Sequence, residues 1–360
     1  MSGQAAPRGA MAREFLTIDK IPIRVDTSKR KKNKKLKAKK ASTSRASAAS
    51  ANEHHREMDP LTIYGQRPQP DETPEFLSKK YVELEEELGN IPTEKKLGWI
   101  SATEKCPTLV NIESHRLMFL RCELFNVKEA ATRICRYWDK RIELFGDVLA
   151  YKPLHVGGEN GALHETADNT PQDADRIKFT WKGLYLGLIR PTRTHDMGGR
   201  ALIFIDPSVM KAYNHTSDER FGVARAVWYV LHNMLEGNET VQKLGIVAIG
   251  YPHNVKLSYL DRKLMKMNME SITGCIPVRL GGFHICHPPW FFGHIVFPII
   301  KVIMPERMRK RLRLHQGSNE KVLASLKKFG LEREVLPIDL GGDVILDTDS
   351  WLNESKKKGL

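Results

Sequence analysis

Apolar residues along the chain follow two different periods, and the change between them predicts two structured parts. Between residues 74 and 150 they recur every three or four positions, as in Val127, Ala130 and Ile134. This spacing places apolar side chains on one face of a helix. Helices are therefore predicted at residues 74–89, 115–124 and 127–145, with caps at Ser114 and Asn126 and an end at Gly146.

From residue 182 onwards, short apolar runs alternate with helical patterns. Strands are predicted at residues 183–189, 201–205, 244–249 and 277–285, and helices at 220–235, 257–272, 289–304 and 321–329. This alternation is typical of an α/β layer with a largely parallel sheet. The predicted organisation is a tail (1–70), a helical bundle (71–150), a linker or insertion rich in Gly, Asp and Asn (151–180), an α/β domain (181–345) and a C-terminal tail (346–360).

Positive charge is concentrated at the N-terminus. Residues 1–50 hold 14 Lys and Arg against 3 Asp and Glu, and so account for most of the net charge of +14. Nine of the twelve residues 29–40 are basic, and an Ala/Ser run follows, which predicts a disordered tail. The basic run could be merely solvated, attracted to an anionic membrane, or a nuclear address or nucleic-acid contact. Because no aromatic residues interleave with it, no specific nucleic-acid partner is expected.

Sequence motifs for enzymatic chemistry are missing. There is no G-x-x-x-x-G-K-[ST], G-x-G-x-x-G or G-x-S-x-G motif. We therefore expect no catalytic residues, no cofactor and no metal. One cluster, His284, Cys286, His287 and His294, could bind zinc, but its spacing favours packed, hydrogen-bonded histidines. The odd number of cysteines, five, fits a reducing cytosol, and neither a membrane-spanning helix nor a signal peptide is expected.

The most informative element is the segment 289–304. Eleven of its sixteen residues are large and apolar, and five basic residues follow between 307 and 313. A helix that is apolar nearly all round is either a core helix or a cover between an apolar cavity and a membrane. The basic residues that follow are typical of a membrane interface.

Three stretches resemble the CRAL-TRIO family of lipid-binding proteins. Residues 119–130 (FLRCELFNVKEA) are similar to its N-terminal helical motif. Residues 277–292 (PVRLGGFHICHPPWFF) are similar to its strand motif, and residues 336–342 (LPIDLGG) to its closing motif. Their order and spacing agree over about residues 75–342. The resemblance implies a helical bundle followed by an α/β lipid-binding domain, in which a sheet forms the floor of an apolar pocket and a gate helix covers it. The segment 289–304 would be this helix, and we call it the gate.

The resemblance also implies a function, which is binding and transfer of a small hydrophobic lipid between membranes without catalysis. The residues expected to contact the lipid are Phe204, Trp228, Ile249, Phe283, Ile285, Trp290, Phe291, Ile295, Val296, Ile299 and Ile303. Those expected to contact the phosphates of an anionic or phosphoinositide-containing membrane are Arg279, Arg307, Arg309, Arg311 and Arg313.

Departures from the family pattern narrow the expected ligand. Val278 stands where the phosphatidylinositol-transfer branch has a Glu, Glu123 where it has an Arg, and His287 where an Asn is usual, which argues against phosphatidylinositol. The second basic position of the strand motif is Gly281. We expect a cytoplasmic, peripherally membrane-associated protein, with nuclear entry through residues 29–40 left open. The alternative is an adaptor or scaffold with a collapsed pocket that acts through its basic tail.

Overall fold

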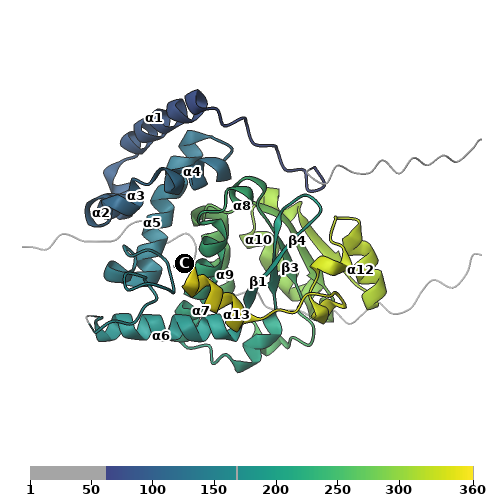
Figure 1. Cartoon of the computed structure of the whole chain (residues 1–360). Helices are drawn as coiled ribbons and strands as arrows, with labels where there is room; N and C mark the ends of the chain where they lie inside the picture. Colours follow the sequence, from purple (N-terminus) through teal and green to yellow (C-terminus); the bar gives the residue numbers. More distant parts are fainter. Residues whose placement is uncertain (1–61, 168, 360) are drawn as a thin grey trace, which may run out of the picture. The chain divides into compact units, whose positions relative to one another are not determined.

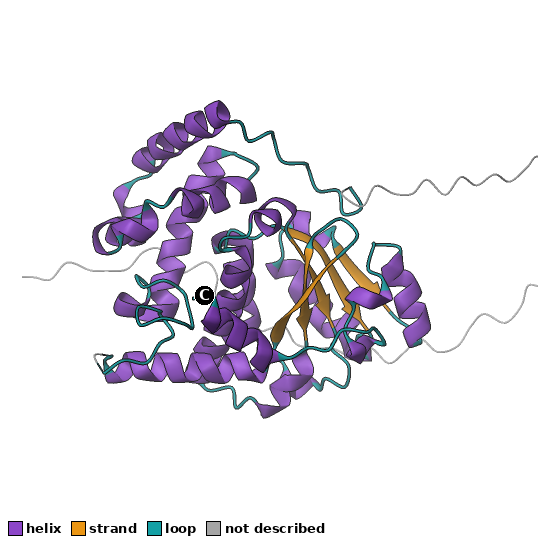
Figure 2. Cartoon of the chain, viewed as in Figure 1, coloured by secondary structure: helices purple, strands orange, loops and turns teal. Residues whose placement is uncertain are grey.

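The computed structural model describes residues 62–167 and 169–359, apart from the side chains of Lys301, Ile303 and Arg307. The basic run at 29–40 lies outside these residues. The described chain has the mixed α/β fold that the sequence predicts, with helices around one five-stranded sheet (Figure 2). In residues 62–359 no helix combines the length and the hydropathy that a membrane crossing requires.

The N-terminal part is helical, as predicted. Its helices are α1 (Pro74–Asn90), α2 (Leu97–Lys105), α3 (Pro107–Val110), α4 (Glu113–Cys122) and α5 (Val127–Leu149). Asn126 caps α5, because its side chain accepts a hydrogen bond from the N–H of Glu129. The two short helices α2 and α3 were not predicted.

The second part contains the sheet and the remaining helices. The helices are α6 (Pro171–Leu186), α7 (Ser217–Leu235), α8 (Glu239–Leu244), α9 (Arg262–Glu270), α10 (Phe297–Ile303), α11 (Glu306–Arg309), α12 (Asn319–Lys327) and α13 (Thr348–Lys357). Two π-helical segments, Ser271–Cys275 and Phe292–Val296, follow α9 and precede α10.

The strands lie in the order in which they occur in the chain. They are β1 (Ile189–His195), β2 (Ala201–Ile205), β3 (Ile246–Gly250), β4 (Leu280–Cys286) and β5 (Leu312–His315). β1 is antiparallel to β2, and the other neighbours are parallel. Helices cover both faces, which parallel sheets require (Figure 1). α7 packs on one face and α12 on the other.

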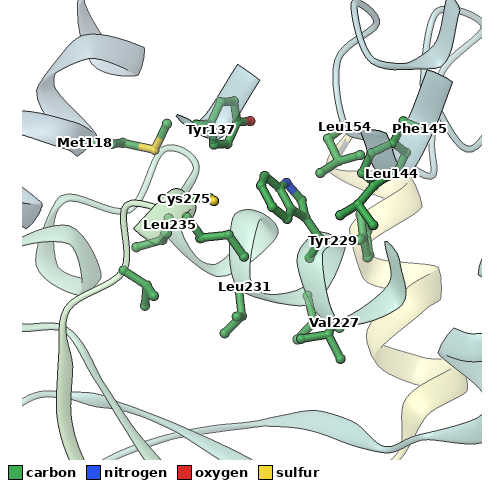
Figure 3. Packing of buried hydrophobic residues seen from close by; sticks show 14 of the residues in the cluster. Met118, Tyr137, Leu144, Phe145, Leu154, Val227, Tyr229, Leu231, Leu235 and Cys275 are labelled. Carbon is green, nitrogen blue, oxygen red and sulfur yellow. The ribbon is translucent and has the colours of Figure 1, made fainter. Parts of the chain in front are cut away.

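The main core lies between α5 and α7. Tyr137 on α5 faces Trp228 on α7, with ring centroids 5.3 Å apart, and both are fully buried. Met118, Leu231 and Leu235 belong to the same cluster (Figure 3). This packing joins the N-terminal helices to the helix that lies on the sheet.

Two predicted elements are wrong, and the strand β5 was not predicted. The strand expected at 183–189 is the end of α6, which begins after the capping residue Thr170 and ends at Gly187 (φ 72°), so the residues assigned to a loop include most of a helix. The single helix expected at 257–272 is broken by Asp261, whose side chain caps α9. The basic residues after the gate lead into an unpredicted strand, β5.

The residues before α1 are part of the folded structure. Residues 62–73, which we call the strap, include Tyr64, only 6% exposed against the sheet. The Gln66 Oε1 accepts a hydrogen bond from Arg200 Nε (2.6 Å), and Gln69 donates to the backbone oxygen of Arg121 (2.8 Å). The predicted tail therefore extends too far into the chain at residues 62–70. The predicted C-terminal tail likewise holds α13, with Leu352 buried.

Candidate ligand-binding site

An apolar cavity of about 250 Å³ lies between the sheet, α7, α9 and the gate. Its lining includes residues from the strands (Ile203, Ile205, Ile246, Ala248, Phe283 and Ile285), from α7 and α9 (Val227, Leu231, Leu264, Met265, Asn268 and Met269), and from the gate and α11 (Phe291, Phe292, Val296, Ile300, Met304 and Met308). Neither Lys nor Arg occurs among the described residues that line it.

The period of a strand decides which sheet residues reach the cavity. Successive side chains on a strand point to opposite faces. On β2, Ile203 and Ile205 line the cavity, whereas Phe204 packs on the opposite face. On β3, Ala248 lines the cavity, whereas Ile249 packs on the opposite face.

The gate presents two faces along its length. Phe292, Val296, Ile300 and Met304 line the cavity at intervals of four residues, and all are buried. A strict interval of four drifts around a regular α-helix, which has 3.6 residues per turn. The π-helical segment Phe292–Val296 has a longer turn and so keeps the series on one face. The opposite face is exposed, with Trp290 82% and Val302 75% accessible.

One charged side chain lies at the edge of the cavity. The carboxylate of Asp261 accepts hydrogen bonds from the N–H of Leu264 (3.0 Å), Arg220 Nε (2.9 Å) and Tyr213 Oη (3.1 Å). Burial alone would raise the pKa of Asp261, but these hydrogen bonds and the charge of Arg220 hold it below its usual value. The carboxylate is thus ionised and already bonded within the protein, which leaves the cavity wall effectively apolar.

The structure places the predicted lipid-contacting residues in several environments. Phe283, Ile285, Phe291 and Val296 line the cavity. Phe204 and Ile249 face away from the cavity, and Trp228 lies in the helical core. Trp290 is exposed, and Ile295 and Ile299 are half-buried but do not belong to the lining. The side chain of Ile303 lies outside the described residues.

Sequence reasoning missed the α9 wall. Leu264, Met265, Asn268 and Met269 line the cavity, whereas Arg262, Lys263 and Lys266 on the other side of α9 are exposed. These four lining residues are spaced by one, three and four positions, which is the pattern of one face of an amphipathic helix, and this pattern could have predicted that α9 lines the cavity. The residues Ile203 and Ile205 could only be chosen over Phe204 once the covered faces of the sheet were known.

The predicted phosphate-contacting arginines also differ in their surroundings. Arg279 donates hydrogen bonds to the backbone oxygens of Lys243 and of Arg67 in the strap (2.8 Å for the latter). Arg311 donates to the Leu280 oxygen (2.6 Å), and Arg313 to the Lys310 oxygen (2.6 Å). Arg309 is exposed, and the side chain of Arg307 lies outside the described residues.

The histidines of the possible zinc cluster are separated. His284 is fully buried on the face of β4 opposite the cavity, His287 follows the end of the strand, and His294 is exposed on the gate. Among the residues that the structure describes, no three His, Cys, Asp or Glu side chains are placed to hold a metal ion.

The fold and site define an α/β domain with an apolar cavity under a helical cover, preceded by a helical bundle. Residues 189–342 match the CRAL/TRIO domain. The α/β part of the chain is therefore similar to the CRAL-TRIO family.

Individual relatives are distant. Clavesin-1 from Xenopus laevis is 23% identical over 301 residues, which are 82% of this chain and 77% of the relative. Clavesin-2 from Homo sapiens is 32% identical over 123 residues, which are 33% of this chain and 36% of the relative. The crystal structure of Sfh5 covers 80% of this chain and 98% of its own, with 13% identity and a TM-score of 0.45.

Proposed function

We propose that this protein binds one small, uncharged hydrophobic ligand in the cavity under the gate and exchanges it with membranes, without catalysis. The observation that carries this proposal is the apolar cavity of about 250 Å³. Pockets for small molecules have volumes from about 300 Å³ upwards, so this cavity is slightly smaller than that range, but it has the mainly apolar lining that such pockets share. The cavity favours a ligand carrier over a scaffold with a collapsed pocket.

The size and charge of the cavity restrict the ligand. A volume of about 250 Å³ is near the lower end of the range for small-molecule pockets, which favours a small ligand. A phospholipid with two acyl chains is far larger. Because the described residues that line the cavity include no cation, a phosphate buried there would also lack a partner among them. A single-chain or ring-based neutral lipophile fits best, with some outward movement of the gate.

We propose that the outer face of the gate docks on anionic membranes. The exposed Trp290 and Val302 would enter the lipid surface. Exposed basic residues flank the gate on two elements: Arg262, Lys263 and Lys266 on α9, and Arg309 and Lys310 at the end of α11. These charges, with the basic run at 29–40, would support reversible association of a cytoplasmic protein. Entry into the nucleus through that run is a further possibility of the same sequence.

The two faces of the gate supply a matched test of ligand binding. Ile300→Asp places a carboxylate in the cavity, whereas Val302→Asp places the same group on the exposed face. Uptake of a fluorescently labelled fatty alcohol is measured for both purified variants, with circular dichroism to establish folding. We expect Ile300→Asp to abolish uptake and Val302→Asp to retain it. Normal uptake by folded Ile300→Asp protein would refute the proposed site.

Membrane docking is tested separately with Arg309→Glu combined with Lys310→Glu. Attraction between surface charges is screened beyond about 8 Å at physiological salt. The double variant should therefore transfer the probe to phosphoinositide-containing vesicles more slowly than the wild type. This difference should shrink as the salt concentration rises, and transfer to neutral vesicles should occur at the wild-type rate. An equal reduction for both vesicle types would contradict docking through these residues.

A further inference from the structure

A buried chain of hydrogen bonds joins the strap to the far edge of the sheet. Tyr64 Oη lies 2.8 Å from His284 Nε2 on β4, and His284 Nδ1 lies 2.8 Å from His315 Nε2 on β5. His315 Nδ1 lies 2.9 Å from Ser325 Oγ on α12. We call these four side chains the relay. Tyr64, His284 and His315 are at most 6% exposed.

Both histidines of the relay are neutral at physiological pH. Burial is the main cause that lowers the pKa of His284 to about 3 and that of His315 to about 4; the charge of Arg313 contributes to both values, and His315 contributes to that of His284. A neutral imidazole has one N–H donor and one acceptor nitrogen. Every contact is therefore satisfied only if all donors point in the same direction along the relay. Removing the hydroxyl at either end leaves a buried imidazole nitrogen without a partner.

The strap is shaped to place Tyr64 at this point. The Tyr64 ring stacks on Phe329, with centroids 5.9 Å apart, and the Arg200 guanidinium lies 5.1 Å from its centroid. Room for the ring comes from Gly282, where a Cβ atom would lie 2.4 Å from the Tyr64 ring. The strap contact is thus built into the sequence of β4, on the face of the sheet opposite the cavity.

The relay also includes β5, the strand that follows the gate and α11 in the chain. β5 is an edge strand of four residues that pairs with β4 alone within the sheet. It begins only four residues after Met308, which lines the cavity, and Arg311 between them is bonded to the Leu280 oxygen (2.6 Å). So short an edge strand has few ladder hydrogen bonds, and the buried His315 anchors it from inside.

From this geometry we infer that Tyr64 is a positioning residue for ligand exchange. Through His284 and His315 it holds β5, and β5 holds the C-terminal end of the gate. The hydroxyl of Tyr64 touches no cavity residue, yet its loss should free the gate to open more often. This inference rests on the proposed function, since it concerns opening of the same cavity.

The test compares Tyr64→Phe with Tyr229→Phe in the full chain. Tyr229 is equally buried, and its hydroxyl accepts a hydrogen bond from Asn233 within α7, away from β4 and β5. Each protein is loaded with the fluorescently labelled fatty alcohol, and dissociation is followed after mixing with excess vesicles. We expect Tyr64→Phe to release the probe at least five times faster than wild type, and Tyr229→Phe to release it at the wild-type rate. Equal rates for the two variants would overturn the inference.

A second variant tests whether the hydrogen bonds at the two ends of the relay act together or independently. Ser325→Ala removes the other end, and we expect it to speed release as well. Because both changes break the same chain of hydrogen bonds, the double variant should increase the dissociation rate of the probe by less than the product of the two single increases. A simple product would mean that the ends act independently, against the inference.

A spectroscopic measurement keeps the inference testable without a ligand. Nitrogen-15 chemical shifts of the imidazole rings should report one tautomer each for His284 and His315 in the wild type, and a mixture in Tyr64→Phe. Unchanged shifts would contradict the relay. Wild-type protein that takes up no probe would refute the proposed function, while the nitrogen-15 result would still decide whether the relay exists.

Discussion

Filling the cavity from its floor should remove binding without weakening the fold. Ala248 lies on the central strand β3, is 3% exposed and lines the cavity. It can be replaced by Val, Leu or Phe, which add two, three and six carbons. Each added carbon takes room from a cavity of about 250 Å³, so Phe should leave the least space for a ligand.

The expected losses of affinity follow from the excluded ligand. Each methylene group that loses its place in the cavity forfeits about 0.8 kcal/mol. Ala248→Val should therefore cost about 1.6 kcal/mol, Ala248→Leu about 2.4 and Ala248→Phe about 5. Since about 1.4 kcal/mol is a factor of ten, these are losses of about 15-fold, 50-fold and more than 1,000-fold.

The assay is equilibrium titration with the fluorescent fatty alcohol, together with thermal unfolding of the empty proteins. Filling a dry apolar cavity commonly stabilises a protein, so the melting temperature should stay level or rise while affinity falls. Val247→Ile is the control, because it adds a carbon to the opposite face of the same strand. Affinity that is independent of the added volume, or lowered equally by Val247→Ile, would refute the cavity as the binding site.

Three further predictions concern stability. Burial lowers the pKa of four histidines below their value of about 6.5 in the unfolded chain; these are His115, His232, His284 and His315. As the pH falls, the unfolded state therefore takes up protons before the folded state does. The free energy of unfolding, measured by urea unfolding, should fall as the pH drops from about 6.5 to 4. A rise in stability over that range would contradict this. Gly282→Ala should push Tyr64 out of place and cost about 1–3 kcal/mol, whereas Gly274→Ala, with open space at its Cβ, should not. Deleting residues 1–61 should weaken binding to anionic vesicles at low salt and leave the melting temperature unchanged. Deleting residues 1–73 should lower the melting temperature. Equal melting temperatures of the two truncated proteins would mean that the strap does not stabilise the fold.

Periodicity predicted the elements that carry their own signal. The helix α5 appears where apolar residues recur every three or four positions after a capping Asn126. The strands β2, β3 and β4 appear at the short apolar runs. The strand expected at 183–189 failed because glycine and apolar residues near a helix end look like a buried strand, and the cap at Thr170 was not recognised. Local signals therefore sufficed only where the signals that mark the ends of an element were recognised.

The lining of the site was harder to predict, for a physical reason. A parallel sheet covered on both faces has continuous apolar strands, so alternation does not tell which face is which. Phe204 and Ile249 are as apolar as Ile203 and Ala248, yet they pack under α12 rather than in the cavity. The gate was easier to predict because its apolar length is unusual, although its inner and outer residues depend on the π-helical segment.

The strap escaped prediction because it carries almost no local signal. Its sequence, with Gly65, Pro68 and Pro70, lacks the period of either a helix or a strand. Its order comes from partners far along the chain, such as His284, which is 220 residues from Tyr64. Glu72 adds an ion pair with the buried Arg121 (2.6 Å), which ties the strap to α4.

The two faces of the sheet therefore have different roles, and β4 contributes residues to both. One face of β4 offers Phe283 and Ile285 to the cavity, while His284 between them faces the strap. A change on either face that moves β4 must be felt on the other, because neighbouring residues of one strand cannot shift independently. This argument accounts for a histidine in the middle of an apolar strand. A leucine there could still contact Phe329, but it would leave His315 Nε2 without its hydrogen-bond partner in the interior and would remove the 2.8 Å contact of the Tyr64 hydroxyl.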